Sequence, residues 1–299
     1  MAFHCGCIIN LFFMTKRNFL IVRTDRLGDV VLSLPLAKII KDNYPDSQVT
    51  FLLREYTKRL ALGNKFIDNI IILEEKNGKP NFFRNINVLK DGKFDTCITV
   101  YPTFLITLIL FLSGIKNRIG TGYRWYSFLF NKKFYEHRKD AKKNELEYNI
   151  NLLNSIGINH LPVKGEIDFG ISVVEEDDLR VDRIMSDYGI ERAKPLVIIH
   201  PGSGGSAVDL PSQKYRELIS MLVNKNIEVC VTGNNNEKEI CNKISEGFPV
   251  KNLVGKFDLS ELISLVNKSF LFISNSTGPL HIAAALGKNV IGFYPKIKA

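Results

Sequence analysis

The sequence predicts an α/β protein made of two units, each with a parallel sheet. In both halves of the 299 residues, short continuous apolar runs alternate with helical stretches, as buried parallel strands and their crossover helices do. A charged helical stretch over residues 172–190 separates the two series. We therefore expect one domain over residues 15–172 and another over 173–299, with residues 1–14 as a disordered or mis-started tail.

The expected strands are the apolar runs at 19–23, 49–54, 69–73 and 95–101, and then at 196–200, 227–233, 270–276 and 289–295. Pro35 should bend or restart its helix, because it lacks an amide donor and clashes with the preceding turn. Asp258 and Glu261 predict a capping box at the start of another helix. The apolar run at 104–115 is shorter than the roughly 20 residues of a membrane span, so we expect a buried or interfacial helix.

The net charge of +9 lies entirely within residues 1–170. Within that half, residues 116–143 hold nine basic and two acidic residues, with seven aromatic residues interleaved. This segment is either a solvated basic face or a surface for an anionic partner. No recognition motif accompanies it, so we expect no nucleic acid partner. Five cysteines without metal-like spacing, apart from a weak Cys5/Cys7 pair, favour free thiols in a reducing cytoplasm.

Three loops follow expected strands, at the sheet edge where open α/β proteins bind ligands. In "TDRLGD" (24–29), Asp29 is either a helix cap or a reactive carboxylate. The glycines of "HPGSGGSAVDLP" (200–211) form either a simple turn or an anion-binding nest, without a Walker lysine. In "SNSTGPLHIAAALG" (274–287), a helix begins near Thr277 and could face phosphate. No residue cluster suggests a metal site.

These three loops, together with "NLVGKFDLSELISLV" (252–266), resemble glycosyltransferase family 9 in order and spacing, from about Phe19 to the end of the chain. These are the ADP-heptose:lipopolysaccharide heptosyltransferases. The resemblance implies a GT-B fold, in which two Rossmann-like domains face a central cleft. Residues 15–172 would bind the acceptor and residues 173–299 the nucleotide sugar. The second domain would lack its last segment. The implied reaction is an inverting, metal-independent transfer of heptose from ADP-heptose to an inner-core sugar, without a cofactor.

The resemblance also assigns roles to residues. It implies that Asp29 is the general base, and this favours the base over the cap. The expected donor-binding residues are Ser203, Gly204, Gly205, Ser206, Gly233, Asn234, Gly255, Lys256, Ser276, Thr277, Gly278 and His281. The expected acceptor-binding residues are Arg26, Arg118 and Arg124. The acceptor would be an anionic glycolipid, with the protein cytoplasmic and peripherally associated with the inner membrane.

The sequence departs from the family pattern at two positions. Family members commonly carry a lysine or arginine where this chain has Ala207-Val208-Asp209, and many have aspartate in place of Ser276. A charged contact to phosphate contributes roughly 1.5–3 kcal/mol, and Lys256 is a candidate substitute. Two alternatives therefore stay open: a related GT-B transferase with another nucleotide sugar, or a degenerate non-catalytic member that binds anionic glycolipid.

Overall fold

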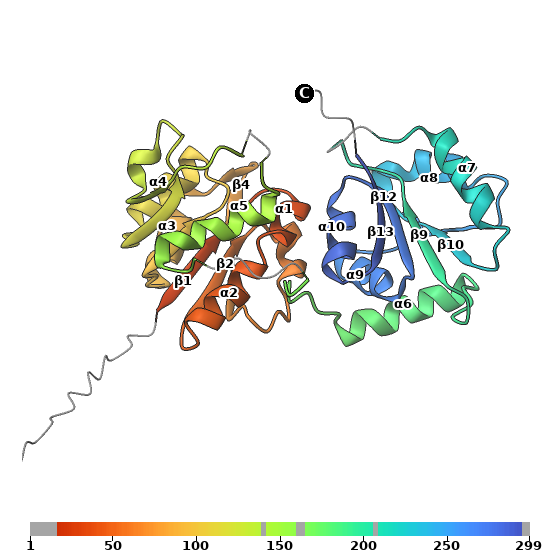
Figure 1. Cartoon of the computed structure of the whole chain (residues 1–299), viewed down its shortest axis with the longest axis horizontal. Coiled ribbons are helices and arrows are strands. Elements are labelled where there is room, and N and C mark those ends of the chain that lie inside the picture. The colour runs from red at the N-terminus through yellow and green to blue at the C-terminus, as the bar shows by residue number, and fades with distance from the viewer. Residues whose placement is uncertain (1–16, 139–141, 160–164, 206–208, 295–299) are drawn as a thin grey trace, which may run out of the picture.

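The computed structural model describes residues 17–138, 142–159, 165–205 and 209–294, and these form two units that lie side by side (Figure 1). Each unit contains one parallel sheet with helices packed on it, which confirms the predicted fold class. The expected tail at 1–14 and the expected donor residue Ser206 lie outside the described residues.

The sheet of the N-terminal unit has six parallel strands in the order β3-β2-β1-β6-β7-β8. They are β1 (Asn18–Val22), β2 (Gln48–Leu53), β3 (Asn69–Ile72), β6 (Thr96–Thr99), β7 (Asn117–Thr121) and β8 (Lys132–Phe134). A small antiparallel hairpin of β4 (Glu75–Lys76) and β5 (Lys79–Pro80) lies between β3 and the next helix.

Helices cover both faces of this sheet, because successive side chains of a strand point to opposite faces. Phe19 and Ile21 of β1 pack in one buried cluster with α1 and α2, whereas Leu20 and Val22 pack in another with α3 and α4. The helices are α1 (Leu27–Val31), α2 (Pro35–Asn43), α3 (Phe82–Asp91), α4 (Phe104–Leu112) and α5 (Glu145–Asn151), with 3-10 turns η1 (Glu55–Leu60), η2 (Ser127–Leu129) and η4 (Leu152–Ile156).

The C-terminal unit repeats this strand order with five parallel strands, β11-β10-β9-β12-β13. They are β9 (Leu196–His200), β10 (Glu228–Val231), β11 (Lys251–Asn252), β12 (Leu271–Asn275) and β13 (Asn289–Phe293). The helices are α6 (Glu175–Asp187), α7 (Ser212–Leu222), α8 (Lys238–Ser245), α9 (Leu259–Lys268) and α10 (Gly278–Ala285), with the 3-10 turn η5 (Asn235–Glu237). In each sheet the order reverses beside the first strand, where ligands of open α/β sheets bind.

The local signals at two helix starts are confirmed. Pro35 is the first residue of α2, and α1 ends four residues before it. Asp258 accepts a hydrogen bond from the Glu261 amide, and the Glu261 carboxylate accepts one from the Asp258 amide. Asp29, by contrast, lies in the first turn of α1 and makes no capping hydrogen bond. Its carboxylate is therefore available for another role.

The two units contact each other chiefly through α1 and α10. Gly28 and Gly278 allow this approach, because a Cβ atom on Gly28 would lie 2.6 Å from His281 Cδ2, and one on Gly278 would lie 2.7 Å from Leu27 Cβ. Ile263 and Ile282 of the C-terminal unit belong to the same buried cluster as the core of the N-terminal unit. The cleft between the units is thus closed at its base by apolar packing.

Candidate active site

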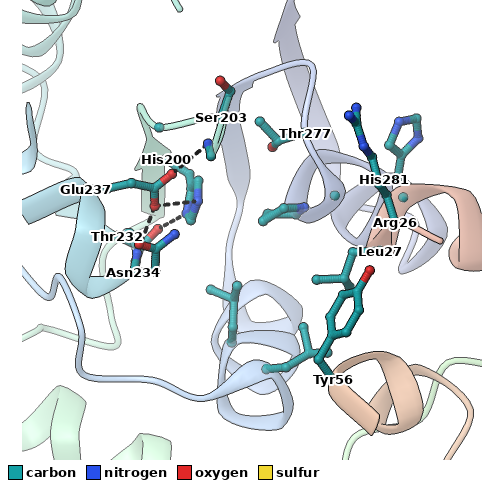
Figure 2. A pocket seen from close by; sticks show the side chains of 18 of the residues that line it. Arg26, Leu27, Tyr56, His200, Ser203, Thr232, Asn234, Glu237, Thr277 and His281 are labelled. Atoms are coloured by element: carbon teal, nitrogen blue, oxygen red, sulfur yellow. Dashed lines mark hydrogen bonds and ion pairs between the residues drawn. The ribbon is translucent and has the colours of Figure 1, made fainter. Parts of the chain in front are cut away.

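A pocket of about 660 Å³ lies between the two units, at the carboxyl ends of their strands. Figure 2 shows His200, Thr232 and Glu237 on one side of it, and Arg26 and His281 on the other. The described residues that line it come from six segments: 26–29, Tyr56, 200–204, 232–237, 257–262 and 276–281. The residues come from both units, so the pocket exists only when the units pack together.

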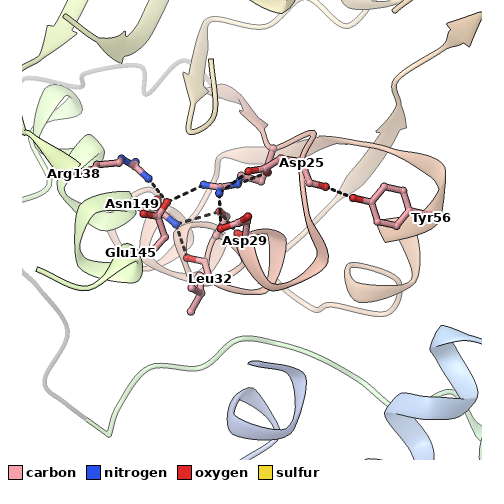
Figure 3. Close-up of polar contacts among 9 residues, drawn as sticks. Asp25, Asp29, Leu32, Tyr56, Arg138, Glu145 and Asn149 are labelled. Carbon is pink, nitrogen blue, oxygen red and sulfur yellow. Dashed lines mark hydrogen bonds and ion pairs between the residues drawn. The ribbon is translucent and has the colours of Figure 1, made fainter. Parts of the chain in front are cut away.

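On the N-terminal side, Asp29 lies next to a buried network of charges (Figure 3). Arg23 follows β1 directly and is only 2% exposed. Its guanidinium donates to Asp25 at 2.6 Å and contacts Asp29 at 3.0 Å and Glu145 at 3.3 Å. Arg138 pairs with the same Glu145 carboxylate. The buried guanidinium thus holds the Asp29 carboxylate in place while leaving it exposed to the pocket.

Asp25 differs from Asp29 in its burial. Burial raises the pKa of Asp25 from 3.8 to about 6, although the neighbouring Arg23 opposes that shift. The Tyr56 hydroxyl donates to the Asp25 backbone carbonyl and ties η1 to this loop. Arg23 therefore pairs with the carboxylates of Asp25, Asp29 and Glu145 at once. Of these three carboxylates, that of Asp29 lines the pocket.

On the C-terminal side, Glu237 organises two loops. It is 8% exposed, and its carboxylate accepts hydrogen bonds from the Gly204 amide at 3.2 Å and the Asn234 amide at 2.8 Å. His200 lies 3.7 Å from the same carboxylate and hydrogen-bonds Thr232 at 3.0 Å. Burial lowers the pKa of His200, and Glu237 opposes that change. Glu237 therefore fixes the glycine-rich loop after β9 against the turn after β10.

The start of α10 forms the third wall. Ser276, Thr277 and Gly278 precede or begin the helix, and all three line the pocket. The first amides of a helix are free to bind anions, and the helix dipole favours negative charge there. Burial lowers the pKa of His281, although Asp29 across the interface opposes this, so the ring favours its neutral form. This wall therefore combines the N-terminus of a helix, whose second residue Pro279 has no amide hydrogen, with a mostly neutral histidine.

The structure brings most of the expected site residues together. Those that line the pocket are Arg26, Asp29, Ser203, Gly204, Gly233, Asn234, Ser276, Thr277, Gly278 and His281. Gly205 follows Gly204 in the same loop, and both have positive φ. The Gly255 amide donates a hydrogen bond to the Gly233 carbonyl and so stabilises the turn after β10. The Lys256 amine lies 5.8 Å from the Tyr188 ring and is not among the pocket-lining residues.

Two expected acceptor-binding arginines lie elsewhere. The Arg118 guanidinium donates to the carbonyls of Leu129 and Ile115 and stacks over Phe111 at 5.0 Å. It is near the amino end of β7, whereas the pocket lies at the carboxyl ends of the strands. Arg124 is exposed in the loop between β7 and η2 and does not line the pocket. Of the three expected arginines, the structure brings Arg26 alone to the pocket.

Sequence reasoning missed several residues of the site, chiefly Arg23, Tyr56, His200, Thr232 and Glu237. Arg23 and His200 each stand where an apolar strand ends, and that position was a usable signal. The sequence signal for Glu237 was weaker and consisted of the capping box that Asn234 and Glu237 form. Among the described residues, no group of three or more histidine, cysteine, aspartate or glutamate side chains could hold a metal ion.

The sequence of this chain resembles those of known proteins. The family model described as glycosyltransferase family 9 (heptosyltransferase) matches residues 82–298. The chain belongs to glycosyltransferase family 9. A Haemophilus influenzae protein, described as a glycosyltransferase without a stated substrate, is 30% identical over 94% of this chain and 83% of its own length. Lipopolysaccharide heptosyltransferase 3 of Escherichia coli is 25% identical, covering 89% of this chain and 80% of its own.

Solved structures of family 9 members share the fold. The Escherichia coli heptosyltransferase WaaC with ADP matches 94% of this chain and 88% of its own, with a TM-score of 0.75 and 18% identity. The expected GT-B architecture is therefore confirmed, and this family 9 member is a glycosyltransferase. No helix in the described parts of the chain has the length and apolar character that a membrane crossing requires.

Proposed function

We propose that this family 9 enzyme transfers heptose from ADP-heptose to the inner core of lipopolysaccharide, with inversion and without a metal. The observation that carries the proposal is the juxtaposition of the Asp29 carboxylate with the N-terminus of α10 in one pocket. The names of its relatives support the sugar and the acceptor, and a structural neighbour with bound ADP supports the nucleotide.

In the proposed reaction, Asp29 accepts the proton of an acceptor hydroxyl, which is otherwise a weak nucleophile. The hydroxyl oxygen forms a bond to the anomeric carbon while the bond to the ADP oxygen breaks. A single displacement from the face opposite ADP inverts the configuration. Arg23 keeps the Asp29 carboxylate aimed at the pocket, since its guanidinium is buried and held by two further carboxylates.

The leaving ADP gains negative charge, and the C-terminal wall supplies groups that stabilise it. The Gly278 amide at the start of α10 is suited to phosphate oxygens, whereas Pro279 has no amide hydrogen and the Gly204 amide already donates to Glu237. Arg26 is the only lysine or arginine among the described residues that line the pocket. We propose that Arg26 provides the charge that the Ala207-Val208-Asp209 stretch lacks, in preference to Lys256.

The acceptor in this proposal is an anionic glycolipid, and the enzyme works peripherally at the cytoplasmic face of the inner membrane. The departures at Val208 and Ser276 favour testing a second candidate, a transferase that uses another nucleotide sugar. Glu237 and Asp258 also line the pocket. Their negative charge affects which nucleotide sugar the pocket can bind.

A panel of nucleotide sugars tests the donor, because a ligand that binds only the folded state raises the melting temperature. We expect ADP and ADP-heptose to stabilise the protein, and ADP-heptose to be consumed only when a lipid A–Kdo type acceptor is present. NMR of the product would show the inverted anomer, and EDTA should leave the rate unchanged. Stabilisation by a UDP- or GDP-sugar instead would replace the donor, and binding without turnover would indicate a non-catalytic member.

A further inference from the structure

Helix α4 presents an apolar face to solvent. It contains no charged residue, and its outward positions are Phe104, Leu108, Phe111 and Leu112, at the i, i+4, i+7 and i+8 spacing of one helix stripe. Phe104, Phe111 and Leu112 are each about two-fifths exposed. The opposite face of the helix packs on the buried cluster around Leu20 and Val22. A helix on a protein surface ordinarily exposes polar residues, so this exposed apolar stripe indicates an interaction surface.

Aromatic side chains extend the stripe beyond the first turn of α4. The Trp125 ring stacks on Phe104 with centroids 4.8 Å apart and is 73% exposed. Phe128, three residues further along, is 67% exposed. Tryptophan and other amphipathic rings favour the boundary between water and the lipid headgroups. We call Phe104, Leu108, Phe111, Leu112, Trp125 and Phe128 the α4 surface.

The chain segment that carries the α4 surface has charges of one sign. No acidic residue occurs between Asp95 and Glu136, and that interval holds five basic residues. Arg124 is exposed beside Trp125 at one end of the surface. At the other end, the Arg118 guanidinium lies over the Phe111 ring, and Lys116 is exposed just after the helix. An apolar stripe with basic residues at both ends matches an anionic lipid surface in both its hydrophobic and its electrostatic character.

We infer that the α4 surface docks this protein on an anionic phospholipid bilayer. In Figure 1, α4 lies at the end of the N-terminal unit away from the C-terminal unit, so docking leaves the donor side unobstructed. The loop from β6 to α4 also leads to the site, since the Tyr101 ring lies 5.9 Å from the Arg23 guanidinium. Docking there brings a lipid-linked acceptor beside Asp29. The position of the acceptor rests on the proposed function, and the docking surface adds to it by naming the face that would contact the membrane.

The chain provides its own reporter, because Trp125 is the only tryptophan among the 299 residues. Titration with vesicles of phosphatidylglycerol and phosphatidylcholine should shift its emission to shorter wavelength as the indole leaves water. Vesicles of phosphatidylcholine alone should cause little shift, and salt near 0.5 M should weaken the anionic binding by screening. Vesicle flotation measures the bound fraction independently of fluorescence.

The matched variants are Phe111→Ser/Leu112→Ser on α4 and Leu179→Ser/Met221→Ser on the C-terminal unit. Leu179 and Met221 are exposed apolar residues as well, so the control variant removes exposed apolar side chains from a different surface. We expect the α4 variant to lose roughly tenfold or more in vesicle partitioning, from the lost apolar burial, and the control variant to bind as wild type. Melting temperatures establish that both variants are folded.

Equal loss in the two variants, or an unshifted Trp125 emission with bound vesicles, would overturn the assignment. A blue shift that depends on protein concentration without lipid would show that a second copy covers the surface, and sedimentation would then give a dimer. The assay contains no sugar, so a negative result leaves the proposed glycosyl transfer untouched. Failure of ADP-heptose turnover would equally leave a positive vesicle result standing.

Discussion

Asp29→Asn separates a catalytic role from a structural role at the carboxylate that α1 places in the pocket. The substitution removes the charge but almost none of the volume. Arg23 loses one contact, at 3.0 Å, and keeps Asp25 and Glu145, so no buried charge is left unpaired. Asp29 is one-third exposed, and an ion pair of this kind contributes up to about 1 kcal/mol. Folding stability should therefore change little.

Turnover should change far more. Asparagine cannot accept the acceptor proton, and loss of a general base typically costs roughly 10²–10⁴-fold in rate. That range corresponds to about 2.7–5.5 kcal/mol in the activation barrier, well above the expected loss of folding stability. The assay follows ADP release from ADP-heptose at saturating donor and acceptor. Affinity for ADP, measured by calorimetry, should stay within a few fold of wild type.

Asp42→Asn is the matched control. Asp42 pairs with Lys38 on the surface of α2, at 2.6 Å, and does not line the pocket. It loses an ion pair through the same chemical change, so its turnover should be that of wild type. If Asp29→Asn turns over within a few fold of wild type, Asp29 is not the base, and the proposed mechanism is refuted.

Three further predictions concern the interface and the buried carboxylates. Gly28→Ala should destabilise the protein by roughly 1–3 kcal/mol and weaken ADP binding, because the new Cβ would lie 2.6 Å from His281 Cδ2; unchanged thermal unfolding would contradict this packing. Glu237→Gln should lower ADP affinity, since one oxygen that now accepts from the Gly204 or Asn234 amide becomes a donor; calorimetry with unaltered affinity would argue against that anchoring. Burial raises the pKa of Asp25 from 3.8 to about 6, so its stabilising contribution is complete below pH 3.8 and is lost as pH rises through 6. Urea unfolding of wild type against Asp25→Asn over this range should show that loss in wild type only, and parallel profiles would refute it.

The sequence alone determined the class of fold and the position of most site loops. Continuous apolar runs marked β1, β2, β9 and β12, because strands buried on both faces admit few polar residues. The turn residues that follow those strands were then placed at the carboxyl edge by the parallel topology alone. Pro35 and the Asp258 capping box are local effects, which explains why both were predictable one helix at a time.

The strands β7 and β8 were not predicted, because their residues are polar and basic as well as apolar. Asn117 and Arg118 begin β7, and Lys132 and Lys133 begin β8, and all four residues are incompletely buried. β8 is the edge strand of the sheet, and β7 lies beside it. β7 forms by pairing with β6, and β8 by pairing with β7, and both pairings are tertiary contacts. The same fold turns the Arg118 guanidinium onto backbone carbonyls, away from the pocket where its charge alone had suggested a role.

Only the tertiary structure decided how the site is held together. Arg23 and Glu145 are 122 residues apart in sequence and meet because α5 packs beside the loop after β1. Glu237 reaches the Gly204 amide from a different strand, and His281 reaches Gly28 from the other unit. Local sequence patterns report the propensities of neighbouring residues, whereas these contacts depend on the packing of two sheets and their helices. The sequence therefore identified the loops, and the packing selected which of their side chains face one another.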